Sequence, residues 1–326
     1  MTPLLEAVDV TKHFVVGGTF RPGGKKLVRA LDGVSLRVER GETVGLVGES
    51  GCGKSTLGRC LIRLYTLTSG QVRFEGTDIS ALPERQLRPL RPRMQMVFQD
   101  PYASLNPRRK VGDLIAEPLR VHTTMNAASV YGRLRELVGL VGLRTEHLDR
   151  YPHEFSGGQR QRIGIARALA LDPALVIADE PVSALDVSVQ AQVVNLMMAL
   201  QERLALTYVF VAHDLSVVRQ ISNRTAVMYL GQIVELGPTE TVFARPLHHY
   251  TAALIAAVPS VEDGPGNKPV LGGEPPNPMA PPNGCRFHTR CPRVEERCRV
   301  EVPMLQTVDG TQAVACHFPV GTPRAN

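Results

Sequence analysis

The chain has 326 residues, 43% of them hydrophobic, and a formal net charge of +6. This length predicts one large domain with a smaller addition, and the apolar fraction suits a packed core. The small positive charge favours anionic ligands or a lipid surface, although an ordinary solvated surface explains it equally well. Because no apolar run approaches about 18 residues, the sequence predicts no membrane span, and the N-terminus shows no secretory signal. We therefore expect a cytosolic protein whose cysteines are reduced unless they bind a metal.

Short apolar runs alternate with helical stretches along most of the chain. Strands are expected at 43–47, 72–74, 94–98, 175–178 and 208–212, and helices at 55–64, 163–171 and 189–204. This alternation predicts an α/β fold with a largely parallel sheet that helices cover on both faces. A separate helical unit is expected at about 100–158.

The composition changes after Val258. Residues 259–284 are rich in Pro and Gly and predict a linker or extended arm, and residues 285–326 hold four of the six cysteines. We therefore expect two domains, at 1–258 and 259–326.

A glycine-rich loop follows the strand at 43–47. Residues 48–55 fit G-x-x-x-x-G-K-[ST], in which backbone N–H groups cradle phosphates, and a chance glycine-rich turn is the alternative. Lys54 is expected to reach the β- and γ-phosphates, and the Ser55 hydroxyl to hold Mg²⁺. Cys52 is interpreted as an incidental small residue. The predicted ATP-binding residues of this segment are Gly48, Ser50, Gly51, Cys52, Gly53, Lys54, Ser55 and Thr56.

Polar side chains follow three of the expected strands. Asp179 closes the strand at 175–178 and is expected to orient Mg²⁺ and its water ligands. Glu180 comes next, so its side chain is aimed differently and can activate the attacking water as a general base. The alternative is that the two acids only cap the next loop. Gln99 and His213 follow two other strands, and a lone histidine at a strand end is more often structural.

Ser156-Gly157-Gly158-Gln159 lies between the phosphate loop and the acidic strand end. Ser156 is expected to be a helix N-cap, with Gln159 completing a capping box. Gly157 and Gly158 are poor helix formers that leave N–H groups open to an anion, although a plain helix start is the alternative. With these motifs in this order, the chain resembles the ATP-binding cassette (ABC) ATPases.

The resemblance to ABC ATPases implies a fold and further residue roles. The fold is a P-loop NTPase domain of the ABC type with an inserted helical subdomain, plus a small loop-rich C-terminal domain. The signature at Ser156 is expected to face a γ-phosphate held by a second subunit. His213 is expected to contact the γ-phosphate, Gln99 to reach Mg²⁺ and the attacking water, and Phe14 to stack on adenine. The loop expected to touch the partner subunit comprises Ser183, Ala184, Leu185 and Asp186.

Three further segments narrow the resemblance. Residues 100–108 read Asp-Pro-Tyr-Ala-Ser-Leu-Asn-Pro-Arg, residues 151–154 read Tyr-Pro-His-Glu, and residues 281–287 read Pro-Pro-Asn-Gly-Cys-Arg-Phe. Together they resemble the ATPase subunits of dipeptide and oligopeptide importers, most of all the second ATPase of the dipeptide system. The resemblance implies a second, non-identical ATPase, two membrane permeases and an external solute-binding protein. It also implies a peripheral position at the cytoplasmic face of the inner membrane.

Other functions stay open from the sequence. An importer ATPase of the same branch could serve nickel or another small solute. A soluble ABC ATPase on the ribosome usually carries two cassettes, and one on DNA usually contains a long coiled coil, whereas this chain has one cassette and no heptad run. We therefore expect no nucleic-acid partner. A pure binding module is disfavoured because Glu180 and His213 are both present.

The C-terminal cysteines Cys285, Cys291, Cys298 and Cys316 are separated by 5, 6 and 17 residues. No C-x₂-C pair occurs, so common zinc and ferredoxin spacings fit poorly. Four thiols in a short cytosolic segment still favour a metal over disulfides. The importer resemblance implies a [4Fe–4S] cluster, and zinc, with His317 as a substitute ligand, is the alternative.

Overall fold

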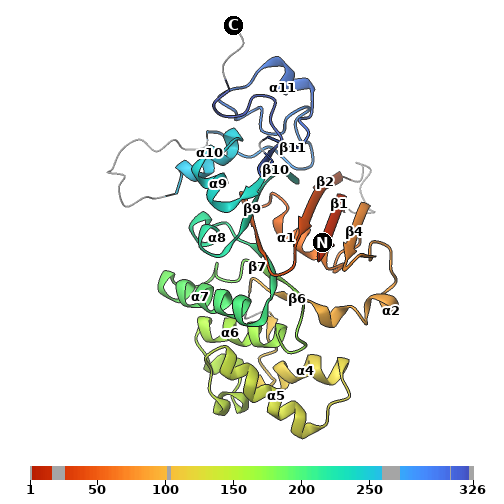
Figure 1. The fold of residues 1–326 in the computed structure, drawn as a ribbon, viewed down its shortest axis with the longest axis vertical. Coiled ribbons are helices and arrows are strands. Elements are labelled where there is room, and N and C mark those ends of the chain that lie inside the picture. Colours follow the sequence, from red (N-terminus) through yellow and green to blue (C-terminus); the bar gives the residue numbers. More distant parts are fainter. Residues whose placement is uncertain (1, 17–25, 101–103, 259–271, 309, 323–326) are drawn as a thin grey trace.

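The computed structural model describes residues 2–16, 26–100, 104–258, 272–308 and 310–322. The molecule is elongated (Figure 1): a helical unit forms one end, and the C-terminal region forms the other. Two sheets lie between these ends, and the larger one carries the phosphate loop and the acidic strand end. Among the described residues, no helix is long and apolar enough to cross a membrane.

The larger sheet has eight strands among the described residues, in the order β11-β12-β10-β9-β3-β8-β7-β6. The five strands from β9 to β6 pair in parallel, which confirms the predicted parallel sheet, whereas β10, β11 and β12 pair antiparallel. The strands are β3 (Thr43–Val47), β6 (Met94–Val97), β7 (Leu175–Asp179), β8 (Thr207–Val211), β9 (Arg224–Tyr229), β10 (Gln232–Pro238), β11 (Gln306–Thr307) and β12 (Ala313–Val314).

The central strands are apolar because both of their faces are covered. Along β7, Leu175 and Ile177 pack into the apolar cluster that contains α1 (Lys54–Leu61), whereas Val176 and Ala178 pack into the cluster that contains α7 (Val187–Leu204). Successive strand side chains point to opposite faces, so one apolar run supplies two cores. Full burial of a Leu, Ile or Val side chain contributes about 1.5–3 kcal/mol.

A second, antiparallel sheet was not predicted, and the strand expected at 72–74 lies in it rather than in the parallel sheet. Its strands run in the order β2-β1-β4-β5: β2 (Lys26–Val38), β1 (Leu5–Val16), β4 (Ser69–Phe74) and β5 (Thr77–Asp78). The register between β1 and β2, which form a long hairpin, shifts at three places. These shifts interrupt the alternation of apolar and polar residues from which a strand is predicted. The hairpin matters for the site because it carries Phe14.

The predicted helices are present with shifted ends. The first helix ends at Leu61 rather than Leu64, because Arg63 is left-handed with φ 56°. The helix expected at 163–171 begins at Gly157, where Ser156 caps it. Its neighbours in the helical unit are α4 and α5. The remaining α-helices are α2 (Glu84–Leu87), α4 (Val111–His122), α5 (Ala127–Leu140), α6 (Gly157–Ala168), α8 (Leu215–Ile221), α9 (Thr239–Ala244), α10 (His249–Ala256) and α11 (Glu296–Val300). Short 3₁₀ turns span Arg91–Arg93, Thr145–Asp149 and Pro152–Glu154.

The C-terminal region is joined to the larger sheet by backbone pairing. Glu235 of β10 pairs with Val314 of β12, and β11 continues the same edge. Glu235 is fully buried and accepts hydrogen bonds from Leu247 N, His248 N and Gln312 Nε2. The strands and this buried carboxyl fix the C-terminal region against the sheet that carries the nucleotide motifs.

Candidate nucleotide site

The phosphate loop, residues 48–53, joins β3 to α1. Gly48 and Gly53 have φ of 149° and 109°, in the range that favours glycine. A Cβ on Gly48 would lie 2.2 Å from Met228 O, and one on Gly53 would lie 2.4 Å from Ala30 O. The backbones of β9 and β2 therefore hold the loop closely at two points. Gly53 caps α1, so the first N–H groups of that helix face the loop.

Lys54 is buried at the first position of α1, with 4% of its surface exposed. Its Nζ donates to Gly48 O at 2.7 Å and to Glu49 O at 3.1 Å. A buried ammonium needs such partners, and phosphate oxygens are stronger acceptors than carbonyls. The loop thus holds a cation where the phosphates of a bound nucleotide would lie.

Ser55 and Asp179 form the part of the site that fits a magnesium ion. Ser55 Oγ donates to Asp179 Oδ1 at 2.6 Å, and Asp179 is fully buried. Hydroxyl and carboxylate oxygens are the ligand types that Mg²⁺ prefers, so this pair fits the ion. Arg59 also belongs to this part of the site, although no motif singled it out: its Nη2 lies 3.3 Å from Asp179 Oδ2. Its signal was the spacing i+4 from Ser55, which places both side chains on one face of α1.

Glu180 meets two other polar side chains at the ends of neighbouring strands. Gln99 Nε2 donates to Glu180 Oε2 at 2.7 Å, and His213 Nδ1 lies 3.8 Å from the same oxygen. Glu180 is left-handed with φ 46°, and its N–H donates to Val211 O at 3.0 Å. A left-handed residue of this kind costs about 1–2 kcal/mol, which the surrounding strands must offset. Parallel strands end at one edge of the sheet, so β6, β7 and β8 bring these three side chains together.

Phe14 lies on β1, opposite Val28 of β2. Its ring meets Tyr65 edge-on with 5.6 Å between centroids, and Lys12 Nζ lies 4.9 Å from the ring centroid. The ring is half-buried, so part of its surface is open to a ligand. Stacking of adenine on Phe14 stays a prediction.

The signature Ser156–Gln159 begins α6 in the helical unit, away from α1 in Figure 1. Ser156 N donates to Gln159 Oε1 at 3.1 Å, and Gln159 N donates to Ser156 Oγ at 3.4 Å, which form the expected capping box. Gly158 also has a packing reason: a Cβ there would lie 2.3 Å from Val189 Cγ1 of α7. The structure therefore does not bring the signature to the phosphate loop of its own chain.

The loop Ser183–Asp186 connects Glu180 to α7. Ser183 Oγ donates to Glu180 O at 3.1 Å, and Asp186 is the N-cap residue of α7. A Cβ on Gly157 would lie 3.2 Å from Leu185 Cδ2, so this loop packs beside the signature. The loop Ser183–Asp186 therefore contacts both Glu180 and the start of α6 in the same chain.

The four C-terminal cysteines line one cavity, although they are spread over residues 285–316 of the sequence. Burial raises the pKa of Cys291 to about 11 and that of Cys316 to about 12, so both thiols are protonated near neutral pH. All six cysteines are free thiols. The cavity lining comprises His248, His249, Cys285, Phe287, His288, Cys291, Arg293, Cys298, Cys316, His317 and Phe318.

The residue types of this cavity fit a metal group, whereas their arrangement does not form one. Among the residues that the structure describes, no group of three or more His, Cys, Asp or Glu side chains is placed to hold a metal ion. His317 Nε2 lies 2.9 Å from Glu301 O, so this nitrogen has a partner in the protein. The predicted cluster and the zinc alternative are thus unsupported by the geometry.

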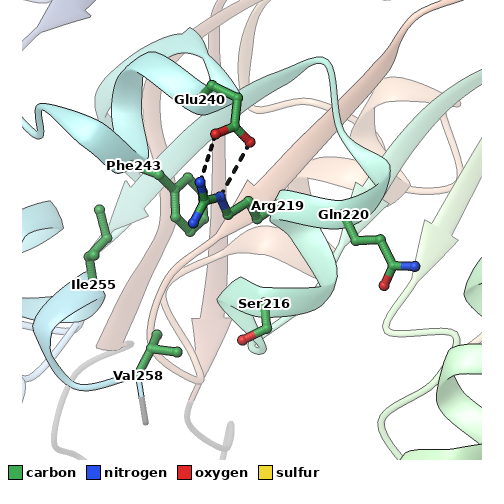
Figure 2. A pocket seen from close by; sticks show the side chains of 7 residues that line it. All are labelled: Ser216, Arg219, Gln220, Glu240, Phe243, Ile255 and Val258. Atoms are coloured by element: carbon green, nitrogen blue, oxygen red, sulfur yellow. Dashed lines mark hydrogen bonds and ion pairs between the residues drawn. The ribbon is translucent and has the colours of Figure 1, made fainter. Parts of the chain in front are cut away.

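A cavity of about 560 Å³ lies between α8, α9 and α10 (Figure 2). Arg219 Nη2 lies 2.8 Å from Glu240 Oε2, and its guanidinium lies over the Phe243 ring at 5.7 Å. The Glu240 carboxylate therefore neutralises the charge of the Arg219 guanidinium, which lines this cavity. None of the sequence-predicted site residues lines it, so it is distinct from the nucleotide site. The lining residues are Ser216, Arg219, Gln220, Glu240, Phe243, Ile255 and Val258.

Two family models match this chain. The model described as "ABC transporter" matches residues 31–183, which include the phosphate loop, the signature and Glu180. The model described as "Oligopeptide/dipeptide transporter, C-terminal region" matches residues 234–298, which include three of the four C-terminal cysteines.

Relatives of known name match almost the whole chain. The "Di/tripeptide transport ATP-binding protein DppF" of Pseudomonas aeruginosa is 50% identical over 97% of this chain and 98% of its own length. The "Oligopeptide transport ATP-binding protein AppF" of Bacillus subtilis is 52% identical over 97% of each chain. Among solved structures, the dimeric post-hydrolysis state of the ATP-binding cassette MJ0796 bound to ADP and Pi matches with a TM-score of 0.65 and 28% identity, over 72% of this chain and 98% of that one.

Proposed function

Because the chain belongs to the ATP-binding subunits of ABC transporters, in the branch with the oligopeptide/dipeptide C-terminal region, we propose that it hydrolyses ATP to power the import of dipeptides or oligopeptides. One observation carries the hydrolytic step: Glu180 Oε2 accepts from Gln99 and lies 3.8 Å from His213. In this proposal residues 1–258 are the ATPase domain, with a helical subdomain at about 100–158, and residues 259–326 are a second domain.

The side chains of the site divide the work of hydrolysis. Lys54 exchanges its loop carbonyls for the β- and γ-phosphate oxygens, and the N–H groups at the start of α1 hold the same phosphates. Ser55 and Asp179 hold Mg²⁺, which neutralises phosphate charge when bound. Glu180 accepts a proton from the attacking water, while Gln99 orients the carboxylate and reaches Mg²⁺ and the same water.

The remaining binding roles concern the two ends of the nucleotide. His213 contacts the γ-phosphate, and Phe14 stacks on the adenine ring. Gly48, Ser50, Gly51, Cys52, Gly53 and Thr56 complete the loop around the phosphates.

The signature acts on the ATP of a second subunit. Its capped helix start offers N–H groups to an anion, and the chain already has a phosphate loop of its own. A cassette that is 28% identical forms a dimer with bound ADP and Pi, which supports this pairing. The partner is a second, non-identical ATPase, and Ser183–Asp186 touches it.

The ATPase pair works beneath two membrane permeases at the cytoplasmic face of the inner membrane. An external solute-binding protein delivers the peptide, and nucleic acid is no partner. The names of the relatives support the peptide class, since they are transport ATP-binding proteins for dipeptides, tripeptides or oligopeptides. ATP binding closes the pair, and hydrolysis reopens it.

Reconstitution tests this function directly. The chain is co-purified with two permeases and a second ATPase of the proposed transporter, inserted into liposomes and supplied with the solute-binding protein. Uptake of a labelled dipeptide, a labelled pentapeptide and ⁶³Ni²⁺ is then compared in the presence of ATP. We expect peptide uptake that Glu180→Gln abolishes and Glu202→Gln, an exposed change on α7, leaves intact. Nickel uptake without peptide uptake would overturn the peptide class, and uptake insensitive to Glu180→Gln would overturn the assigned base.

We also propose that the cysteine cavity takes up a [4Fe–4S] cluster, with zinc as the alternative. The proposal rests on the residue types: Cys285, Cys291, Cys298 and Cys316 line one cavity, although in this structure they do not form a metal-ligand set. A short Pro- and Gly-rich region buries little apolar surface, and a metal would supply folding energy.

Anaerobic purification decides between these metals. A cluster predicts brown protein with about four iron and four sulfide per chain, and loss of the colour in each Cys→Ser variant. Colourless protein with one zinc would select zinc. Four free thiols without metal would reject both.

A further inference from the structure

The cysteine region reaches the phosphate loop through one arginine. Arg290 immediately precedes Cys291, yet its guanidinium forms a two-pronged ion pair with Glu49, the second residue of the phosphate loop. The two distances are 2.8 Å for Nη1 to Oε2 and 3.0 Å for Nη2 to Oε1. These residues are 241 positions apart, so the contact exists only in the folded chain.

The ion pair is shielded from solvent and supported on both sides. The Arg290 side chain is 4% exposed and that of Glu49 is 24% exposed. Arg290 Nε also donates to Gly272 O at 3.0 Å, and Nη1 lies 3.4 Å from the Tyr229 hydroxyl. Because the guanidinium is planar and donates two parallel hydrogen bonds to Glu49, it fixes the direction of the carboxylate as well as its distance.

The backbone of Glu49 is held as well as its side chain. Glu49 N donates to the Tyr250 hydroxyl at 2.8 Å. The Phe287 ring packs against Tyr250 and Tyr229, with centroids 5.4 Å and 5.3 Å away. Phe287 lies between Cys285 and Arg290, so one C-terminal segment supports both attachments of Glu49.

A second arginine of the same segment secures the far side of the loop. Arg286 donates to Leu230 O and pairs with Asp32 of β2. The adjacent Gly231 N donates to Cys52 O of the phosphate loop at 2.8 Å. Residues 285–291, which we call the strap, therefore fix the phosphate loop at its beginning and near its end.

We propose that Arg290 is a positioning residue for ATP binding, through which the strap holds the phosphate loop in its phosphate-binding form. The inference rests on ATP binding at this loop and adds that the C-terminal region controls its affinity. The loop has positive φ at Gly48, Gly51 and Gly53, a conformation that a freed glycine loop loses readily. When Glu49 is already fixed, ATP binding has to order less of the phosphate loop and therefore costs less conformational entropy. Because coupling between two sites is reciprocal, bound ATP should in turn stabilise the strap.

The competing interpretation is that Arg290 only fastens the C-terminal region to the ATPase domain. Both interpretations predict some loss of stability when the ion pair is removed. Only the positioning role predicts a loss of ATP affinity in protein that remains folded.

The test compares Arg290→Gln with Arg290→Lys and with Arg297→Gln in the full chain. Arg297 is the matched control, because it forms a two-pronged pair with Glu301 at the exposed surface of the same region. We expect Arg290→Gln to weaken MgATP binding by about tenfold, within the usual range of coupling between sites. Arg290→Lys should recover part of the loss, and Arg297→Gln should bind as wild type does. Calorimetry gives the affinity, and circular dichroism confirms the folded state.

Two further measurements extend the test, and the first of them, on Glu49→Gln alone, keeps the inference testable if Arg290→Gln folds poorly. Glu49→Gln breaks the same ion pair from the loop side, and it should weaken ATP binding similarly, with little added by Arg290→Gln in the double variant. In wild type, MgATP should slow hydrogen exchange of residues 285–291, and this protection should vanish in Arg290→Gln. Wild-type ATP affinity in both single variants, or fully additive effects, would overturn the positioning role. Absence of ATP binding in wild type would instead overturn the proposed function.

Discussion

The phosphate loop and the signature are both glycine-containing helix starts, and the chain treats them differently. The loop is enclosed: Met228 O and Ala30 O approach its glycines closely, and Lys54 is buried with partners. The signature is open: Ser156 is exposed, and its capping box is with Gln159, three residues away. The difference shows that the phosphate loop is enclosed within the chain, whereas the helix start at the signature is open, as the proposed pairing with a second subunit requires.

The largest expected effect is a loss of ATP hydrolysis in a variant that leaves both the phosphate loop and the signature intact. Glu180→Gln should keep ATP affinity and lower turnover by about 10²–10⁴-fold, because the water loses its base. The variant should accumulate the closed ATPase pair in the presence of ATP. Turnover by the assembled transporter and gel filtration measure the two outcomes. An unchanged rate would place the base elsewhere.

The next largest effect is a loss of ATP affinity at the phosphate loop, the enclosed site. Lys54→Ala should weaken ATP binding by about 10–100-fold, because charged hydrogen bonds to phosphate are lost. Lys110→Ala is the control, since Lys110 lies at the start of α4 and pairs with Asp149 at the surface. Equal affinities of the two variants, measured by calorimetry, would contradict the assigned role of Lys54.

Two glycines of α6 test whether packing explains the glycine at position 158 of the signature. Gly158→Ala should destabilise the fold by about 1–3 kcal/mol, because its Cβ would overlap Val189. Gly164→Ala should instead stabilise by up to about 1 kcal/mol, since a Cβ there meets no atom within 4 Å. Chemical denaturation of the two variants measures both values. The opposite order would show that packing against α7 does not explain Gly158.

The smallest effect concerns the cysteine inside the phosphate loop. Burial raises the pKa of Cys52, so its thiol should react slowly with iodoacetamide at pH 8. Cys52→Ser should change ATP turnover by less than about twofold, because a buried small side chain is replaced by another of similar size. Rapid alkylation of Cys52, read by mass spectrometry, would disagree with this assignment.

The sequence by itself determined which residues make up the predicted nucleotide site. The loop at 48–55, the acids at 179 and 180, and the polar residues at strand ends carry local signals, because parallel strands deliver their ends to one edge. The apolar run at 43–47 also predicted both ends of β3 correctly, because both faces of that strand are buried. The irregular hairpin of β1 and β2 escaped prediction, because its register shifts interrupt the period of two.

Only the tertiary structure decided which distant residues act on that site. Arg290 and Glu49 are separated by most of the chain, and nothing in either local sequence indicates the other. The convergence of four cysteines on one cavity and the closeness of Gly158 to Val189 also follow from packing between elements. Local motifs report what a segment can bind because backbone geometry is short-range. Contacts across the fold depend on how the sheets and helices pack, and that information is spread over the whole chain.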